Sequence, residues 1–168
     1  NSMDPFSTTM LVRLLVAMLC GMVLGAERVL ASKSAGLRTY ALVSIGSALF
    51  VLISESVVLM HPGGIDTDPL RMAAQIVTGI GFLGAGIIMV RKDHVVGVTT
   101  ASGIWVAAAI GTAAGFGLFW LAIVATLLTL FIFVVLWFVE RAIEREISPF
   151  TGSLADTDRG GFEGEAKE

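Results

Sequence analysis

The chain has 168 residues, of which 55% are hydrophobic and 15% are charged, and its mean hydropathy is +0.86. A soluble domain usually carries about 25% charged residues, so the composition excludes an ordinary soluble fold and indicates a membrane protein. No Asp, Glu, Lys or Arg occurs from His94 to Val139, whereas residues 140–168 hold eight acids. The net charge of −3 therefore reflects a tail, and no nucleic-acid partner is expected.

Residues 1–7 are interpreted as a leader that includes a remnant of an expression vector, and the membrane domain is expected to cover residues 8–147. The first span is predicted from about Thr8 to Leu30, and the second from about Leu37 to Leu59. About 20 apolar residues suffice to cross a bilayer. The single cysteine, Cys20, excludes an internal disulfide and is expected to be a small buried side chain.

The third span is predicted from Leu70 to Val90, after Asp68-Pro69. It contains Gly79, Gly81 and Gly84, which spell G-x-G-x-x-G. A dinucleotide-binding loop would need a preceding strand and an acidic residue about 20 positions on, and neither is present. Glycines at this spacing inside a membrane helix instead allow close helix packing.

The uncharged stretch after His94 must contain two further spans. A single helix from Thr99 to Val139 would be about 60 Å long, which is twice the hydrocarbon thickness of about 30 Å. The chain is therefore expected to turn at Gly115-Phe116-Gly117, between a fourth span at about Thr99–Ala114 and a fifth at about Leu118–Val139. Residues 148–168 form an acidic tail that is too polar to fold alone.

A weak internal repeat relates the second and third spans. Leu37-Arg38, Ala41 and Gly46 recur 33 residues later as Leu70-Arg71, Ala74 and Gly79. An inverted repeat of this kind occurs in transporters, although four matches in a sequence this apolar also arise by chance.

Charged groups near the spans are the first candidates for function, because charge is costly in lipid. Glu27, Arg28 and Arg38 lie near one end of the first two spans, where a Glu27–Arg38 ion pair is one interpretation and independent solvation of each group is the other. Asp68 suits a helix N-cap before Pro69. The alternative is that Asp68, Asp66 and Glu55 form an acidic mouth that binds Mg²⁺.

Polar groups and glycines inside the spans complete the set of candidates. The further functional candidates are Arg71, Gln75, Thr78, Thr99 and Thr100. The glycines expected to lie at helix contacts are Gly21, Gly25, Gly46, Gly79, Gly81, Gly84, Gly86, Gly111 and Gly115. One of these faces is a candidate for a homodimer interface.

Three segments carry a family resemblance: AERVLASKSAGLRTYALVSIGSALF at 26–50, DPLRMAAQIVTGIGFLGAGIIMV at 68–90 and GVTTASGIWVAAAIG at 97–111. Together they resemble the MgtC/SapB family of bacterial inner-membrane proteins. The resemblance implies a five-span membrane domain linked to magnesium limitation and to survival inside macrophages. In some members it also implies inhibition of the membrane sector of the rotary ATP synthase.

Two departures limit what the resemblance implies. The virulence members carry a C-terminal ACT-like domain, where this chain has only an acidic tail, and some members have Asn at the position of Thr99. No nucleophile with a base and no His/Cys cluster is evident, so an enzyme is not expected, nor a cofactor other than Mg²⁺. Two hypotheses remain: a protein that modulates another membrane complex, and a small transporter or ion-binding protein for Mg²⁺ or H⁺.

The distribution of basic residues predicts the orientation in the membrane. Arg28, Lys33 and Arg38 follow the first span, Arg91 and Lys92 the third, and Arg141 and Arg145 the fifth. By the positive-inside rule these segments are cytoplasmic, so the N-terminus is expected outside and the C-terminus inside.

Reporter fusions will test this topology. Fusions after Met60 and after Gly115 should be extracytoplasmic, and fusions after Lys33, after Lys92 and at the tail should be cytoplasmic. A tail reporter active on the outside would contradict the five-span arrangement.

Overall fold

The computed structural model describes residues 5–61, 68–91 and 94–143 of the chain. The chain divides into two units, residues 1–130 and 131–168. The acidic tail expected at 148–168 lies outside the described residues. The first unit therefore holds almost all of the described membrane domain.

The described residues are almost entirely helical. The elements are α1 (Pro5–Leu30), α2 (Leu37–Met60), α3 (Pro69–Ile87), β1 (Met89–Arg91), β2 (His94–Val96), α4 (Val98–Gly115) and α5 (Phe119–Phe131), with a π-helical turn at Ile132–Leu136. Five helical stretches are long and apolar enough to cross a membrane: Ser7–Leu30, Leu37–Met60, Leu70–Ile87, Val98–Gly115 and Phe119–Ile143. The prediction of an all-helical, five-span membrane protein is confirmed, and the sidedness of its termini stays a prediction.

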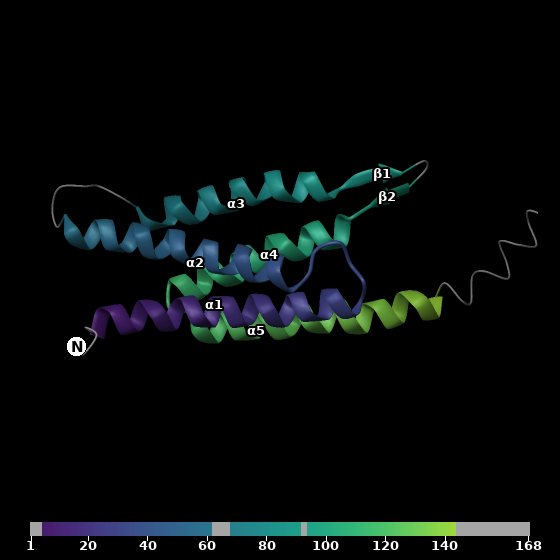
Figure 1. Cartoon of the computed structure of the whole chain (residues 1–168), viewed down its shortest axis with the longest axis horizontal. Coiled ribbons are helices and arrows are strands. Elements are labelled where there is room, and N and C mark those ends of the chain that lie inside the picture. The colour runs from purple at the N-terminus through teal and green to yellow at the C-terminus, as the bar shows by residue number, and fades with distance from the viewer. Residues whose placement is uncertain (1–4, 62–67, 92–93, 144–168) are drawn as a thin grey trace, which may run out of the picture. The chain divides into compact units, whose positions relative to one another are not determined.

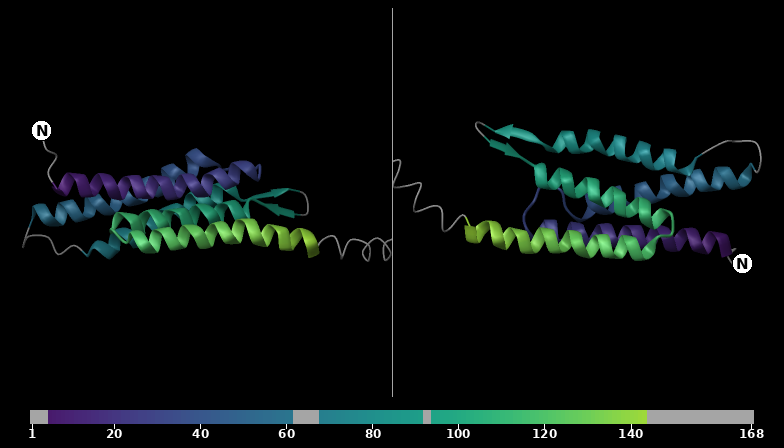
Figure 2. Two further views of the ribbon diagram at one scale, coloured as in Figure 1. Left: turned by 90° about the horizontal axis from the view of Figure 1, so that it is seen from below. Right: turned by 180° about the vertical axis from the view of Figure 1, so that it is seen from behind.

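Helices α1, α2 and α4 pack closely on one another, whereas α3 lies at the edge of the first unit. α2 contacts both α1 and α4, and α3 contacts α4 and, less extensively, α2. Figure 1 and the right-hand view of Figure 2 show α2 and α4 between α3 on one side and α1 on the other. Burial follows this order, because 56% of the α4 span is buried but only 6% of the α3 span.

Glycines bring the backbones of α1 and α4 against α2. A Cβ at Gly21 of α1 would lie 2.9 Å from the Cα of Ala41, and a Cβ at Gly25 would lie 2.5 Å from the Cα of Leu37. On the other side of α2, a Cβ at Gly111 of α4 would lie 2.8 Å from the Cα of Ser44. Real Cβ atoms essentially never approach so closely, so a side chain at any of these positions would separate the helices.

The end of the third span was predicted wrongly. Instead of continuing to Val90, the helix ends at Ile87, and β1 pairs with β2 in an antiparallel hairpin with Val90 opposite Val95. Apolarity continues past the end of the helix, and a short apolar run does not distinguish strand from helix. Gly97 closes the hairpin with a φ of +92° and lies against the backbone carbonyl of Ile87, where a Cβ would clash.

The predicted turn between the fourth and fifth spans is confirmed. Gly117 has a φ of +77°, and the N–H of Leu118 donates to the carbonyl of Ala113 at 2.9 Å. This is the Schellman arrangement, which caps the last carbonyls of a helix and favours glycine at the left-handed position. The glycine thus ends α4 and allows α5 to begin at Phe119.

The described part of the second unit is a helical segment with aromatic residues at its end. Trp137 and Phe138 form an edge-to-face pair with ring centres 4.9 Å apart. The guanidinium carbon of Arg141 lies 4.1 Å from the centre of the Trp137 ring. Trp and Arg together are typical of the membrane–water interface, where an aromatic body and a charged end are both satisfied.

The tight contacts of α4 predict a contrast between two glycine substitutions. Gly111→Ala places a methyl group against the backbone of Ser44, so it should cost about 1–3 kcal/mol or more. Gly81→Ala, with no atom within 4 Å of the new Cβ, should be neutral or slightly stabilising. Thermal unfolding in detergent measures both, and equal melting temperatures for the two variants would contradict the close packing of α2 and α4.

Candidate functional site

Two hydrogen bonds join the three packed helices. Ser44 Oγ on α2 donates to the carbonyl of Ala17 on α1 at 2.7 Å, and Tyr40 Oη donates to the carbonyl of Thr100 on α4 at 3.4 Å. The side chains of Tyr40 and Ser44 are fully buried. Of the predicted candidates, Thr100 therefore belongs to the packed core, with its backbone as the bonding group.

Arg28 is a buried charge at the end of α1. Its side chain is only 3% exposed, and its Nε donates to the carboxylate of Glu27. Both groups also lie within electrostatic range of Tyr40. The Glu27–Arg38 pair, one of the two interpretations from the sequence, is not formed. Glu27 compensates the charge of Arg28, whereas the exposed Arg38 makes no ion pair with a described residue. The physical reason is that a buried guanidinium needs a counter-charge, while an exposed one is solvated.

A second ion pair links three helices at the other end of α1. Arg13 Nη1 donates to Glu55 Oε2 on α2 at 2.5 Å and to the carbonyl of Gly115 on α4 at 3.1 Å. This contact was not predicted from the sequence. A signal was present, because Arg13 lies near the start of the first span and Glu55 near the end of the antiparallel second one, which places opposite charges at similar depths.

The acidic-mouth hypothesis fits the described residues poorly. Glu55 is held by Arg13, and Asp66 lies outside the described residues. Asp68 accepts the N–H of Leu70 at 2.9 Å and so caps α3, with Pro69 at the first helical position. Among the described residues, no group of three or more His, Cys, Asp or Glu side chains is placed to hold a metal ion.

A groove of about 530 Å³ separates α2 from α3. Apolar residues line most of it, together with Ser47, Gln75, Gly46 and Gly79. A Cβ at either glycine would meet no atom within 4 Å. Both glycines leave room in the groove, and Gln75 is the polar candidate that the structure places there.

The other candidates lie apart from this groove. Arg71, Thr78 and Thr99 are exposed, and the Thr78 hydroxyl donates to the carbonyl of Ala74 at 3.1 Å. Of the glycines expected at helix contacts, Gly81 and Gly86 have open space at the Cβ position, and a Cβ at Gly84 would be in ordinary contact with Ala101, at 3.8 Å. The structure thus brings Gly21, Gly25, Gly111 and Gly115 against neighbouring helices and leaves most of the α3 glycines uncovered by this chain.

These observations define a small polytopic helical membrane protein in which two arginines are each paired with a glutamate and one helix, α3, remains largely uncovered. The chain belongs to the MgtC family, whose model matches residues 14–142.

Similar proteins support this assignment. The putative magnesium transporter YhiD of Escherichia coli K12 is 47% identical over 124 residues, covering 71% of this chain and 56% of that protein. Protein MgtC of Salmonella typhimurium is 47% identical over 120 residues, covering 71% of this chain and 49% of that protein. A Haemophilus influenzae protein is 38% identical over 138 residues, covering 80% and 58%. The chain thus spans about half the length of these relatives, and no solved structure matches it.

The Arg13–Glu55 pair can be tested by a double-mutant cycle. Arg13→Gln and Glu55→Gln should each destabilise the protein by about 1–3 kcal/mol, because each leaves a partly buried charge without its partner. The double variant should lose less than the sum of the two. Arg38→Gln, at an exposed position, serves as the control and should stay within about 0.5 kcal/mol of wild type. Strict additivity in detergent unfolding would show that the pair contributes no coupling.

Proposed function

We propose that this chain is a non-enzymatic protein of the bacterial inner membrane that binds and modulates another membrane complex during magnesium-limited growth. The observation that carries the proposal is the groove between α2 and α3, where Gly46 and Gly79 leave open space beside the polar Gln75. Membrane helices associate through small residues that allow close approach and through polar groups that hydrogen-bond across the contact. The groove therefore suits a transmembrane helix of a partner protein.

The membrane sector of the rotary ATP synthase is the partner that the family resemblance suggests. The same resemblance links the protein to survival inside macrophages. Both properties would belong to a protein that regulates proton-driven energy conversion rather than to a catalyst. The two ion pairs are consistent with a structural role for the four charged residues that form them.

Transport of Mg²⁺ or H⁺ is the alternative. The name of the Escherichia coli relative, a putative magnesium transporter, favours it. A carboxylate that carries a cation must be free to exchange partners, whereas Glu27 and Glu55 are each paired with an arginine. That pairing favours the modulator.

Filling the groove should separate the modulator from its alternative. Gly79→Leu places a side chain in the groove, and its Cβ would meet no atom within 4 Å, so the protein should fold but lose function. Gly81→Leu is the matched control, two residues away on the same helix with equal free space outside the groove. Growth in low magnesium and ATP-driven proton pumping in inverted membrane vesicles measure function. Loss of growth in low magnesium together with increased proton pumping, relative to wild type and in Gly79→Leu but not in Gly81→Leu, supports the modulator.

Flux measurements and Asp68 variants complete the test. Mg²⁺ or H⁺ flux in proteoliposomes containing only this chain would favour transport over modulation. Asp68→Asn retains a capping side chain, whereas Asp68→Ala loses about 1 kcal/mol with the cap. Normal growth of the Asn variant would remove Asp68 from the functional residues and leave it as a cap.

A further inference from the structure

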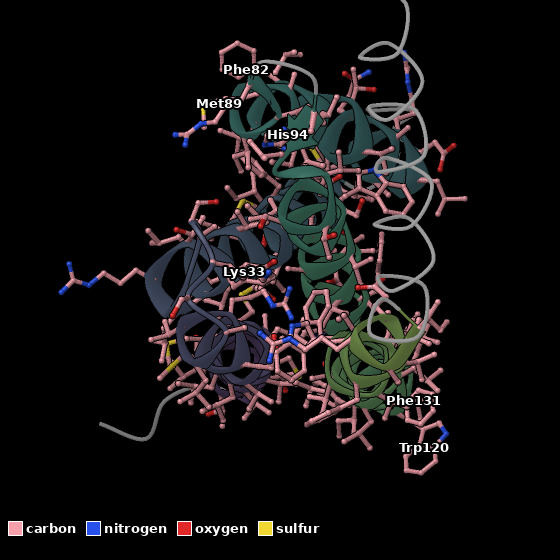
Figure 3. All side chains as sticks on the ribbon, turned by 90° about the vertical axis from the view of Figure 1, so that its right-hand side faces the viewer. Lys33, Phe82, Met89, His94, Trp120 and Phe131 are labelled. Carbon is pink, nitrogen blue, oxygen red and sulfur yellow. The ribbon has the colours of Figure 1, made fainter. Side chains whose placement is uncertain are left out.

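The side of α3 that faces away from α4 has a regular and unusual composition. Its residues, spaced three and four apart in turn, are Asp68, Arg71, Gln75, Thr78, Phe82 and Ala85, and all are exposed. We call this set the outer stripe. Phe82 is 83% exposed. Figure 3 shows its side chain at the outer edge of the molecule, pointing away from the other helices. The opposite side of α3 contains Ile76, which is buried in a cluster with Ala108 of α4.

The outer stripe contains a polar group that this unit does not satisfy. The side-chain amide of Gln75 forms no hydrogen bond with any described residue, and Gln75 lies six residues after Pro69 in a helix of 19 residues. At 1.5 Å per residue it is about 9 Å from the start of a helix about 28 Å long. It is therefore expected within the hydrocarbon region, where an amide without a partner is unfavourable and lipid tails supply no donor or acceptor.

The chemistry of the outer stripe is complementary to itself. A glutamine amide both donates and accepts, so two copies related by a two-fold axis satisfy each other. Two chains inserted in the same direction have parallel α3 helices, and the alternating three- and four-residue spacing is that of a parallel helix pair. Asp68 and Arg71 have opposite charge one turn apart, so Arg71 of each copy can pair with Asp68 of the other. The open space at Gly86, which does not line the groove, permits close approach.

We propose that the chain forms a parallel two-fold dimer through the outer stripe of α3, with Gln75 hydrogen-bonded to Gln75 of the second copy. This interface goes beyond the proposed function, because it uses the side of α3 opposite α4, while the groove for another membrane protein opens between α2 and α3. Gln75 lies at the border of the two surfaces, whereas Phe82 and Ala85 do not line the groove.

Cysteine crosslinking of the full chain in liposomes tests the interface by its periodicity. In a Cys20→Ser background, single cysteines at positions 74–86 should form disulfide-linked dimers most readily at 75, 78, 82 and 85. Val77→Cys is the matched control for Thr78→Cys, at nearly the same depth but on the flank of the helix. Crosslinking with a maximum at 77 and 81, or none at any position, would overturn the proposal in favour of another occupant or a lipid-covered monomer.

The dimerisation constant supplies an independent readout. Förster transfer between labelled copies, measured as a function of the protein-to-lipid ratio, should give a dissociation constant about 3- to 30-fold weaker for Gln75→Leu than for wild type. Gln75→Asn should retain most of the affinity. Ser102→Ala, which removes an exposed hydroxyl of α4 bonded to its own helix at 3.0 Å, should have no effect. An unchanged dissociation constant for Gln75→Leu would overturn the proposal. A Gly79→Leu protein that still dimerises but does not support growth would show that the dimer is separate from the proposed function, and the dimer proposal would stand.

Discussion

The backbone contact of α2 with its two neighbours is the constraint on which the rest of this structure depends. Ser44 lies at its centre, with its hydroxyl bonded to α1 at 2.7 Å and its backbone against Gly111 of α4. In a bilayer there is little hydrophobic gain when one apolar helix meets another, so close van der Waals contact and interhelical hydrogen bonds must supply the stability. The missing side chain at Gly111 lets the backbones of α2 and α4 approach closely enough for such contact.

Such close packing leaves α3 outside. The three helices that interlock have small residues facing one another, whereas α3 meets α4 through larger side chains such as Ile76 and Ile80 and buries little of its surface. Among the described helices, the one with the most glycines is therefore the one most accessible to other molecules. A fold arranged in this way keeps the closely packed helices and the uncovered helix separate, which accords with the proposed regulatory role.

Much of this arrangement could be predicted from residue patterns, and the failures have physical reasons. Hydropathy located five spans, and the bilayer thickness required the turn at Gly117. Hydropathy could not separate the end of α3 from strand β1, because both are apolar. The packing role of Gly111 was predicted from its four-residue spacing to Gly115. The same spacing of small residues occurs at Gly81, which this chain leaves uncovered, so spacing alone does not distinguish the two positions. Ion pairs depend on helix adjacency and rotation, so the contact of Arg13 with Glu55 was missed. Neither of the two interpretations of Glu27, a pair with Arg38 or independent solvation, included its contact with Arg28.

The contact of Arg13 with Glu55 and Gly115 bears on biogenesis. Its partners are 42 and 102 residues further along the chain, so the arginine leaves the ribosome long before either of them. An arginine inside a membrane helix opposes insertion by up to about 2.5–3.5 kcal/mol. The first helix therefore gains its counter-ion only when the second has entered the bilayer. Insertion of the two as a helical hairpin, rather than one after the other, is the order that this geometry favours, and arrival of α4 then completes the attachment.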